Sequence, residues 1–301
     1  GYGRMKGTPA TTLLHLGPGL GNGIANLHNA RRAGTPLINL IGNHTLDHVA
    51  YDAPLTSDID TLAKNVSSWI KSDSTSSTLA EDGMLALQAA STAKPGSEGQ
   101  ISTMIIPADA CWGEAGDLSS SLASPKKPSV DDAVIKQVAE KIDASSMILL
   151  NNDGLSIASR VAASRIRALT GCKGVLTTFP GRVDGGPGTP VFDRMPYFPE
   201  QVLATLRDVS TLVLAGTDAP VSFFAYPEIP SLLVPESCEA ITLAAGEENV
   251  TQALESLADF MNAPTSGLQV YEKKLPDLPV GKLNVMKTAA IIARQLPEKD
   301  I

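Results

Sequence analysis

The chain has 301 residues, with 24 basic and 32 acidic side chains and a formal net charge of −8. A composition of 43% hydrophobic and 19% charged residues is typical of a folded protein with a sizeable core and argues against disorder. The acidic balance without a basic cluster argues against nucleic acid or an anionic membrane as a partner, and no apolar run reaches the roughly 18 residues of a membrane span.

The cysteines and the ends of the chain bear on where the protein works. Cys111, Cys172 and Cys238 are far apart and form no CxxC pair, which argues against a zinc site or a disulfide scaffold. The first residues do not look like a targeting peptide. We expect a reducing compartment, either the cytoplasm or an organelle lumen. Because the chain starts at Gly1 and stops just after a helical pattern, we also expect it to be a fragment.

Short apolar strands alternate with helical patterns, which predicts α/β architecture: two Rossmann-like three-layer domains with central parallel sheets. The first unit covers residues 1–113. Its strands are expected at 12–16, 37–41 and 101–106. A glycine-rich turn is expected at 17–23, and helices at 24–32, 59–70 and 79–93.

A linker rich in Ser, Pro and Lys, residues 114–128, separates this unit from a second one at 129–263. The second unit's strands are expected at 147–150, 175–177, 212–215 and 231–234. Its helices are expected at 130–142, 154–169, 200–209 and 249–261, with a long loop at 179–199. A proline-bearing linker, 263–280, leads to a last helix at 282–295.

The sharpest motif is the glycine-rich segment from His15 to Gly23, which lies between a predicted strand and a predicted helix. Glycines there let a ligand approach the backbone, and the helix N-terminus offers free N–H groups. A GxGxxG dinucleotide motif fails at its third position, whether counted from Gly17 or from Gly19, and no P-loop Lys-Ser/Thr follows. A plain strand-to-helix turn that needs glycines is an equal alternative.

All four histidines, His15, His28, His44 and His48, lie near this motif. His15 and His44 fall at or just beyond strand ends, where open α/β sheets place ligands. His44 and His48 are four residues apart but form no HExxH pattern, so metal binding is not favoured. We interpret His28 and His48 as surface residues. His15 belongs to an otherwise apolar strand, where an imidazole would need a partner.

Four segments, residues 1–5, 15–22, 26–32 and 51–55, together resemble the pyrimidine-binding domain of thiamine-diphosphate-dependent enzymes. The chain is similar to acetolactate synthase large-subunit-like proteins and also resembles benzoylformate decarboxylase. The resemblance implies a pyrimidine-binding domain at 1–113, a central Rossmann-like domain at 129–263, and at 264–301 a linker with the first helix of a diphosphate-binding domain.

The resemblance also implies roles for individual residues. Gly17, Pro18, Gly19 and Asn22 match a G-P-G-x-x-N turn that lies against the cofactor's aminopyrimidine ring, with Pro18 and Asn22 as the expected contacts. His15 matches a histidine that assists proton transfers in benzoylformate-decarboxylase-like members. Imidazole suits that role because it exchanges protons near neutrality. Acetolactate synthases proper generally have no histidine at this position.

Two parts of the family's site have no counterpart in this chain. The glutamate that activates the cofactor lies before the segment matching Gly1, and the Gly-Asp-Gly motif for diphosphate and Mg²⁺, with its later Asn, is missing. Residues 152–154, Asn-Asp-Gly, are interpreted as a strand-to-helix turn with Asp153 near an N-cap. We therefore expect thiamine diphosphate with Mg²⁺ as cofactor, with the metal and diphosphate ligands outside this chain.

The central unit offers two further segments. Some family members bind FAD there, and the glycine- and proline-rich loop 179–193, with Arg182 as its first cation, is a candidate for that role. Packing of the loop against the neighbouring domain is the favoured interpretation. Phe223, Phe224 and Tyr226 are interpreted as core or interdomain residues, with the wall of a substrate pocket as the alternative.

The resemblance implies that the parent protein is an enzyme, a lyase or transferase that decarboxylates or ligates 2-oxo acids as a homodimer or homotetramer. Two alternatives stay open. One is a non-catalytic binding or assembly protein built from the same two domains. The other is a nucleotide-binding oxidoreductase, which the failed GxGxxG motif disfavours.

Overall fold

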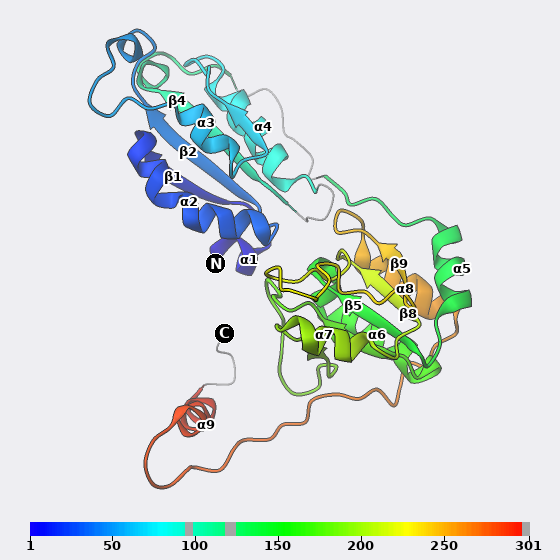
Figure 1. The fold of residues 1–301 in the computed structure, drawn as a ribbon. Coiled ribbons are helices and arrows are strands. Elements are labelled where there is room, and N and C mark those ends of the chain that lie inside the picture. The colour runs from blue at the N-terminus through cyan, green and yellow to red at the C-terminus, as the bar shows by residue number, and fades with distance from the viewer. Residues whose placement is uncertain (94–98, 118–124, 297–301) are drawn as a thin grey trace.

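The computed structural model describes residues 1–93, 99–117 and 125–296. Two sheets organise these residues, one of four strands and one of five, and in both sheets the paired strands run parallel (Figure 1). This confirms the predicted α/β class with parallel sheets. Within the described ranges, no helix is both long and apolar enough to cross a membrane.

The first sheet has the strand order β1-β2-β4-β3. Its strands are β1 (Ala10–His15), β2 (Leu37–Asn43), β3 (Trp69–Lys71) and β4 (Ile101–Pro107). The α-helices around it are α1 (Tyr2–Lys6), α2 (Leu16–Arg32), α3 (Ile59–Lys64) and α4 (Leu79–Ser91). Two short 3-10 helices, η1 (His48–Tyr51) and η2 (Ala108–Cys111), follow β2 and β4.

Helices α2 and α3 cover one face of this sheet. Leu20 of α2 and Ile59 of α3 are buried in one cluster with Ile41 and Ile105 of the central strands. The connection from β3 through α4 to β4 runs back across the sheet, so a right-handed crossover puts α4 on the opposite face. The first unit is therefore a three-layer sandwich of helices around a parallel sheet.

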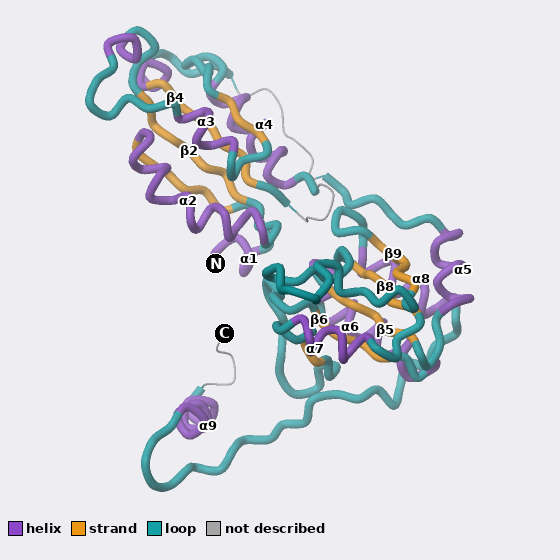
Figure 2. The backbone as a smooth tube through the Cα atoms, in the orientation of Figure 1, coloured by secondary structure: helices purple, strands orange, loops and turns teal. Residues whose placement is uncertain are grey.

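The second sheet has the strand order β7-β6-β5-β8-β9. Its strands are β5 (Ser146–Leu150), β6 (Lys173–Leu176), β7 (Asp193–Arg194), β8 (Thr211–Ala215) and β9 (Glu239–Ala244). The helices are α5 (Asp132–Lys141), η3 (Asn152–Leu155), α6 (Ile157–Thr170), α7 (Pro199–Leu206) and α8 (Val250–Phe260). A long extended segment then leads to α9 (Val285–Gln295) (Figure 2).

Strand β5 shows why strands of the second sheet are continuous apolar runs in the sequence. Met147 and Leu149 pack on the α7 side, whereas Ile148 and Leu150 pack on the side of α5, α6 and α8. Alternate side chains of a strand point to opposite faces, and both faces are covered here. Every residue of β5 is consequently buried.

One predicted helix of the first unit is wrong in extent, and one strand was not predicted. The helix predicted at 59–70 ends at Lys64, and strand β3 (Trp69–Lys71) follows it. The chain leaves the helix because the backbone N–H of Ser68 bonds to the carbonyl of Ile101, which aligns the segment beside β4. Tertiary pairing overrides the helical pattern of the sequence.

In the second unit the strand predicted at 231–234 is wrong. Leu232 is half exposed and forms only an isolated bridge with Val221. The edge strand is instead β9 (Glu239–Ala244), which pairs with β8. The predicted loop 179–199 also contains the two-residue strand β7. Apolar runs of four residues do not by themselves distinguish a strand from a covered loop.

Part of the linker predicted at 114–128 lies outside the described residues. Its last residues are attached to the second unit. Lys127 forms an ion pair with Asp153, and the carbonyl of Pro128 accepts a hydrogen bond from the Asn249 backbone N–H. The chain therefore enters α5 from a fixed point beside α6 and α8.

The three cysteines differ in their surroundings, and all are free thiols. Cys172 and Cys238 are buried, and burial raises the pKa of both thiols. Cys111 is exposed. We expect DTNB to modify only Cys111 rapidly in the native chain, because thiolates are the reactive form. Cys111→Ser should remove the fast phase, whereas rapid release of three equivalents would contradict the burial of the other two.

Candidate functional site

The candidate site lies where the strands of the first sheet end. β1 ends at His15, which pairs with Gly42 of β2, and Asn43 pairs with Pro107 at the end of β4. Because the strands are parallel, their carboxyl ends meet at one edge, where open α/β sheets bind ligands. The predicted motif, residues 15–22, begins at this edge.

The turn into α2 differs from the prediction. The glycine-rich turn expected at 17–23 is wrong, because α2 already begins at Leu16 and contains every one of these glycines. The chain reverses at Leu16, a buried residue with a φ of 54°. Such a positive φ is rare for a leucine and concentrates the change of direction in one residue.

The glycines of α2 allow close packing rather than a turn. A Cβ on Gly17 would lie 2.2 Å from Oγ of Ser57, and one on Gly19 would lie 3.3 Å from the carbonyl carbon of Leu14. The helix N-terminus therefore sits tightly between the end of β1 and the segment that precedes α3.

This packing gives a test by substitution and rescue. We expect Gly17→Ala to lower the free energy of unfolding by about 1–3 kcal/mol, because the new methyl group overlaps the Ser57 side chain. Ser57→Gly in the same chain should restore the stability, since alanine favours a helix over glycine by up to about 1 kcal/mol. Urea denaturation measures both, and a destabilised double variant would contradict the contact.

The predicted site residues are all on α2 or at its start. The side chains of His15, Pro18 and Asn22 are exposed, Gly19 is half-buried and Gly17 is buried. His15 is the residue before α2 and extends the strand conformation, with φ −103° and ψ 107°. Its exposure corrects the expectation that the imidazole needs a protein partner, because water can reach it.

A buried polar row sets the position of β1, and so of His15. The Thr12 hydroxyl donates to Oδ1 of Asn39 at 2.9 Å, and Nδ2 of Asn39 donates to the Thr103 hydroxyl at 3.4 Å. These residues are directly paired across β1, β2 and β4. A slip of one residue would remove Thr12 from this row and turn His15 to the other face of the sheet.

Sequence reasoning missed a ring cluster at the same edge. The rings of His44 and His48 are 5.1 Å apart in an edge-on contact, and the His48 ring is 6.2 Å from that of Tyr51. His44 Nε2 is buried and has no hydrogen-bond partner among the described residues. The four-residue spacing of His44 and His48 was the one signal in the sequence that could have predicted this ring contact. The interpretation of His48 as an exposed residue holds, but its ring contacts His44.

The Asn-Asp-Gly segment of the central unit forms η3 and not the direct start of α6. Ser156 is the N-cap of α6, and its side chain accepts from the Ser159 backbone N–H. Asp153 thus lies near a cap, as predicted, between the N-caps Asn151 and Ser156, and its carboxylate pairs with Lys127. Among the described residues, no group of three or more His, Cys, Asp or Glu side chains could hold a metal ion.

Arg182 packs the central loop against the first unit. Its guanidinium donates to the carbonyls of Arg4 at 3.2 Å and Met5 at 3.3 Å, and it pairs with Asp184 at 2.8 Å. Arg4 in turn donates to the Gly181 carbonyl at 3.4 Å. These contacts use the arginine for packing between the two units, which is the interpretation that the sequence favoured for this loop.

Phe223 and Phe224, which follow β8, are not core residues, which corrects that part of their interpretation, and Tyr226 is half-buried. Phe223 and Phe224 are 58% and 57% exposed. Their rings are 4.7 Å apart, and that of Phe223 also contacts Phe179 and Tyr197 at 5.9 and 5.5 Å. They form a cluster on the surface of the central unit.

Comparison with known proteins places the first residues of the chain in a family. Residues 1–64 match the family described as thiamine pyrophosphate enzyme, N-terminal TPP binding domain. The whole chain is 41% identical to a Mycobacterium tuberculosis protein named "Putative acetolactate synthase large subunit IlvX", of which it covers 57%.

Solved structures share the fold. A thiamine diphosphate-dependent 4-hydroxybenzoylformate decarboxylase of Rhodococcus jostii RHA1 matches 100% of this chain and 60% of its own, with a TM-score of 0.77 and 18% identity. A benzoylformate decarboxylase of Polynucleobacter necessarius matches 99% and 58%, with a TM-score of 0.74 and 17% identity. The chain thus spans little more than half the length of these relatives.

The family match at residues 1–64 includes the motif that follows β1. The chain thus carries the N-terminal cofactor-binding domain of the thiamine pyrophosphate enzymes, and over its full length it is similar to an acetolactate synthase large-subunit-like protein.

Proposed function

We propose that this chain is part of a thiamine-diphosphate-dependent enzyme that decarboxylates or ligates 2-oxo acids. One observation carries the proposal: exposed His15 lies at the carboxyl edge of a parallel sheet, two residues before the Gly-Pro-Gly-x-x-Asn segment in the first turns of α2. This segment lies within the residues that match the cofactor-binding family.

The residues present fit the pyrimidine half of the cofactor. Gly17 and Gly19 let α2 sit close to β1, while Pro18 and Asn22 remain exposed beside them. Pro18 offers an apolar surface and the Asn22 amide offers both a donor and an acceptor, as a neutral aminopyrimidine requires. As the resemblance to the family implies, groups outside this chain would hold the diphosphate and Mg²⁺.

His15 is the proton carrier of the proposed site. Bound thiamine diphosphate would supply the carbanion chemistry that removes carbon dioxide from a 2-oxo acid. The exposed imidazole of His15 can give or take a proton at the end of β1, and in its charged form it attracts a carboxylate. The polar row of β1 keeps it in place for this role.

We further propose the domain organisation and the assembly. Residues 1–113 form a pyrimidine-binding domain, residues 129–263 a central domain, and residues 264–301 a linker with the first helix of a diphosphate-binding domain. As the resemblance to the family implies, we propose that the parent works as a homodimer or homotetramer. Three free thiols fit a reducing cytoplasm.

The test uses the natural full-length protein. With thiamine diphosphate and Mg²⁺, it should release carbon dioxide from at least one member of a panel of aliphatic and aromatic 2-oxo acids, and omission of the cofactor should abolish the release. No release from any member would favour the binding or assembly alternative. Stabilisation against heat by NAD instead would favour the oxidoreductase.

A further inference from the structure

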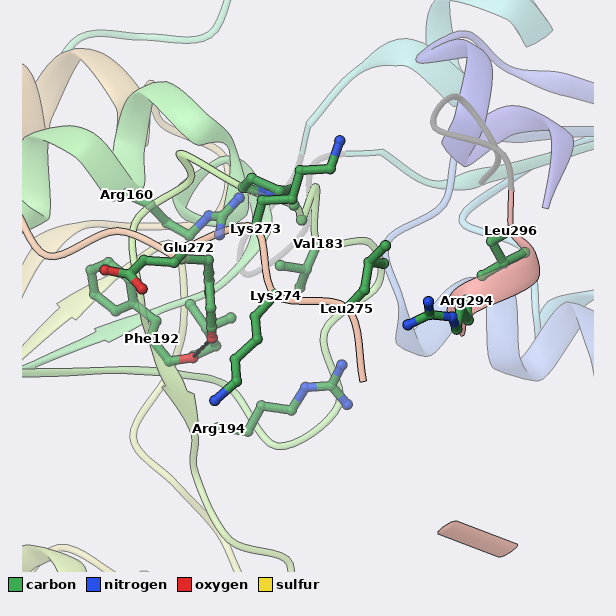
Figure 3. A pocket seen from close by; sticks show the side chains of 15 residues that line it. Arg160, Val183, Phe192, Arg194, Glu272, Lys273, Lys274, Leu275, Arg294 and Leu296 are labelled. Atoms are coloured by element: carbon green, nitrogen blue, oxygen red, sulfur yellow. Dashed lines mark hydrogen bonds between the residues drawn. The ribbon is translucent and has the colours of Figure 1, made fainter. Parts of the chain in front are cut away.

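A cavity of about 670 Å³ lies between the second unit and the chain that follows it, and no residue of the proposed active site lines it. The loop that contains Val183 and β7 forms one wall, and the segment that follows Tyr271 forms the other (Figure 3). Five basic side chains line it against one acidic side chain, Glu272; the basic ones are Arg160, Arg194, Lys273, Lys274 and Arg294. In a chain of net charge −8 this is a strong local excess of positive charge.

Arg160 brings a buried positive charge to this cavity. Its side chain is 2% exposed and donates to the carbonyls of Leu155 at 3.1 Å, Pro190 at 3.5 Å and Asp184. Burial lowers the pKa of Arg160, yet a guanidinium stays protonated in proteins. Its hydrogen bonds go to neutral carbonyls, and the carboxylate of Asp184 offsets part of the effect of burial on the guanidinium.

The two walls are fastened to each other by backbone hydrogen bonds. The Gly188 N–H donates to the Tyr271 carbonyl at 2.8 Å, and the Tyr271 N–H donates to the Thr189 carbonyl at 2.9 Å. Arg194 stands on β7 and Lys274 on the facing segment, so the two cations come from opposite walls (Figure 3). The two walls of the cationic cavity are therefore held together by the backbone itself.

Apolar residues complete the lining. Leu176, Val183, Phe192 and Leu275 contribute to the wall, and Tyr271 adds an aromatic ring. A cavity of this volume, apolar with a few placed polar groups, is typical of sites for organic ligands. A phosphate group carries nearly two negative charges and three acceptor oxygens, which suits several arginines and lysines better than a single carboxylate does.

We infer that the cationic cavity binds a small organic phosphate, with the phosphate among Arg194, Lys274 and Arg160 and the apolar body against Phe192 and Val183. This site uses no residue of the proposed thiamine-diphosphate site. Its test therefore succeeds or fails independently of the proposed enzymatic activity.

The first experiment labels the 301-residue chain with pyridoxal 5′-phosphate. The probe's aldehyde condenses with a lysine amine and releases water, and borohydride then reduces the imine to a stable amine that peptide mass spectrometry locates. We expect Lys274 to be labelled at least about tenfold more than Lys6, an exposed lysine on α1. Inorganic pyrophosphate should block this labelling, and pyridoxal without its phosphate should not reproduce it.

Matched variants connect the labelling to the cavity. Arg194→Gln should weaken pyrophosphate binding in calorimetry about tenfold, the change expected for the loss of one charge-assisted hydrogen bond. Arg207→Gln removes an exposed charge at the end of α7, and binding should remain as in the unmodified chain. Uniform labelling of the lysines, no protection by pyrophosphate, or equal effects of the two variants would overturn the inference.

Discussion

Replacing His15 by glutamine in the full-length protein is expected to lower turnover on a 2-oxo acid by about 10²–10⁴-fold. Glutamine keeps the polarity and much of the size of the imidazole but cannot exchange a proton near neutrality. Because His15 stands beside the proposed cofactor contacts and is not one of them, the affinity for thiamine diphosphate should change little. Steady-state rates and cofactor titrations separate the two effects.

The matched control is His28→Gln. His28 is exposed on α2, the same helix, but lies outside the motif at the helix start. Its replacement should leave both rate and cofactor affinity unchanged. Equal rates for the His15 variant and the natural protein would remove His15 from the mechanism, whereas loss of cofactor binding would assign it a structural role.

Replacing Arg160 by methionine is expected to lower the free energy of unfolding by about 3 kcal/mol. Methionine retains the apolar length of the side chain but leaves the carbonyls of Leu155, Asp184 and Pro190 without their donor. Two of these carbonyls belong to the loop before β7, so the loop would also lose its attachment to α6. Urea denaturation of the 301-residue chain measures the change.

Arg207→Met is the control for this second substitution. Arg207 is exposed at the end of α7, so losing its charge should change stability by less than about 0.5 kcal/mol. A midpoint shift without a change in the denaturant slope would indicate a loss of stability alone. If the Arg160 variant matched the control, the carbonyl contacts would not stabilise the loop.

Much of the fold follows from local pattern. The strands at 147–150 and 212–215 are continuous apolar runs, and the structure buries every residue of β5 and β8 between two layers of helices. The helix predicted at 249–261 nearly coincides with α8 (Val250–Phe260), which Asn249 caps. In these elements burial, helix period and capping residue agree, so the sequence alone is sufficient to predict them.

The misplaced elements depend on long-range pairing. Trp69–Lys71 becomes a strand because β4, about thirty residues later, offers it an edge, and Glu239–Ala244 becomes one because β8 does. The residues near each of these segments contain no signal that β4 or β8 will offer it a strand to pair with. The same limit applies to Phe223 and Phe224, whose exposure depends on how other loops are arranged.

For the candidate site, the sequence by itself determined which residues are present: a histidine at a strand end, then Gly-Pro-Gly-x-x-Asn, in a resemblance that the family match confirms. Only the tertiary structure decided that Gly17 packs on Ser57 and that His44 meets His48. It also brought Arg160, Arg194 and Lys274 around one cavity. The identity of each residue and the local spacing of apolar residues can be obtained from the sequence. Contacts between distant segments exist only once the sheets and their crossovers have formed.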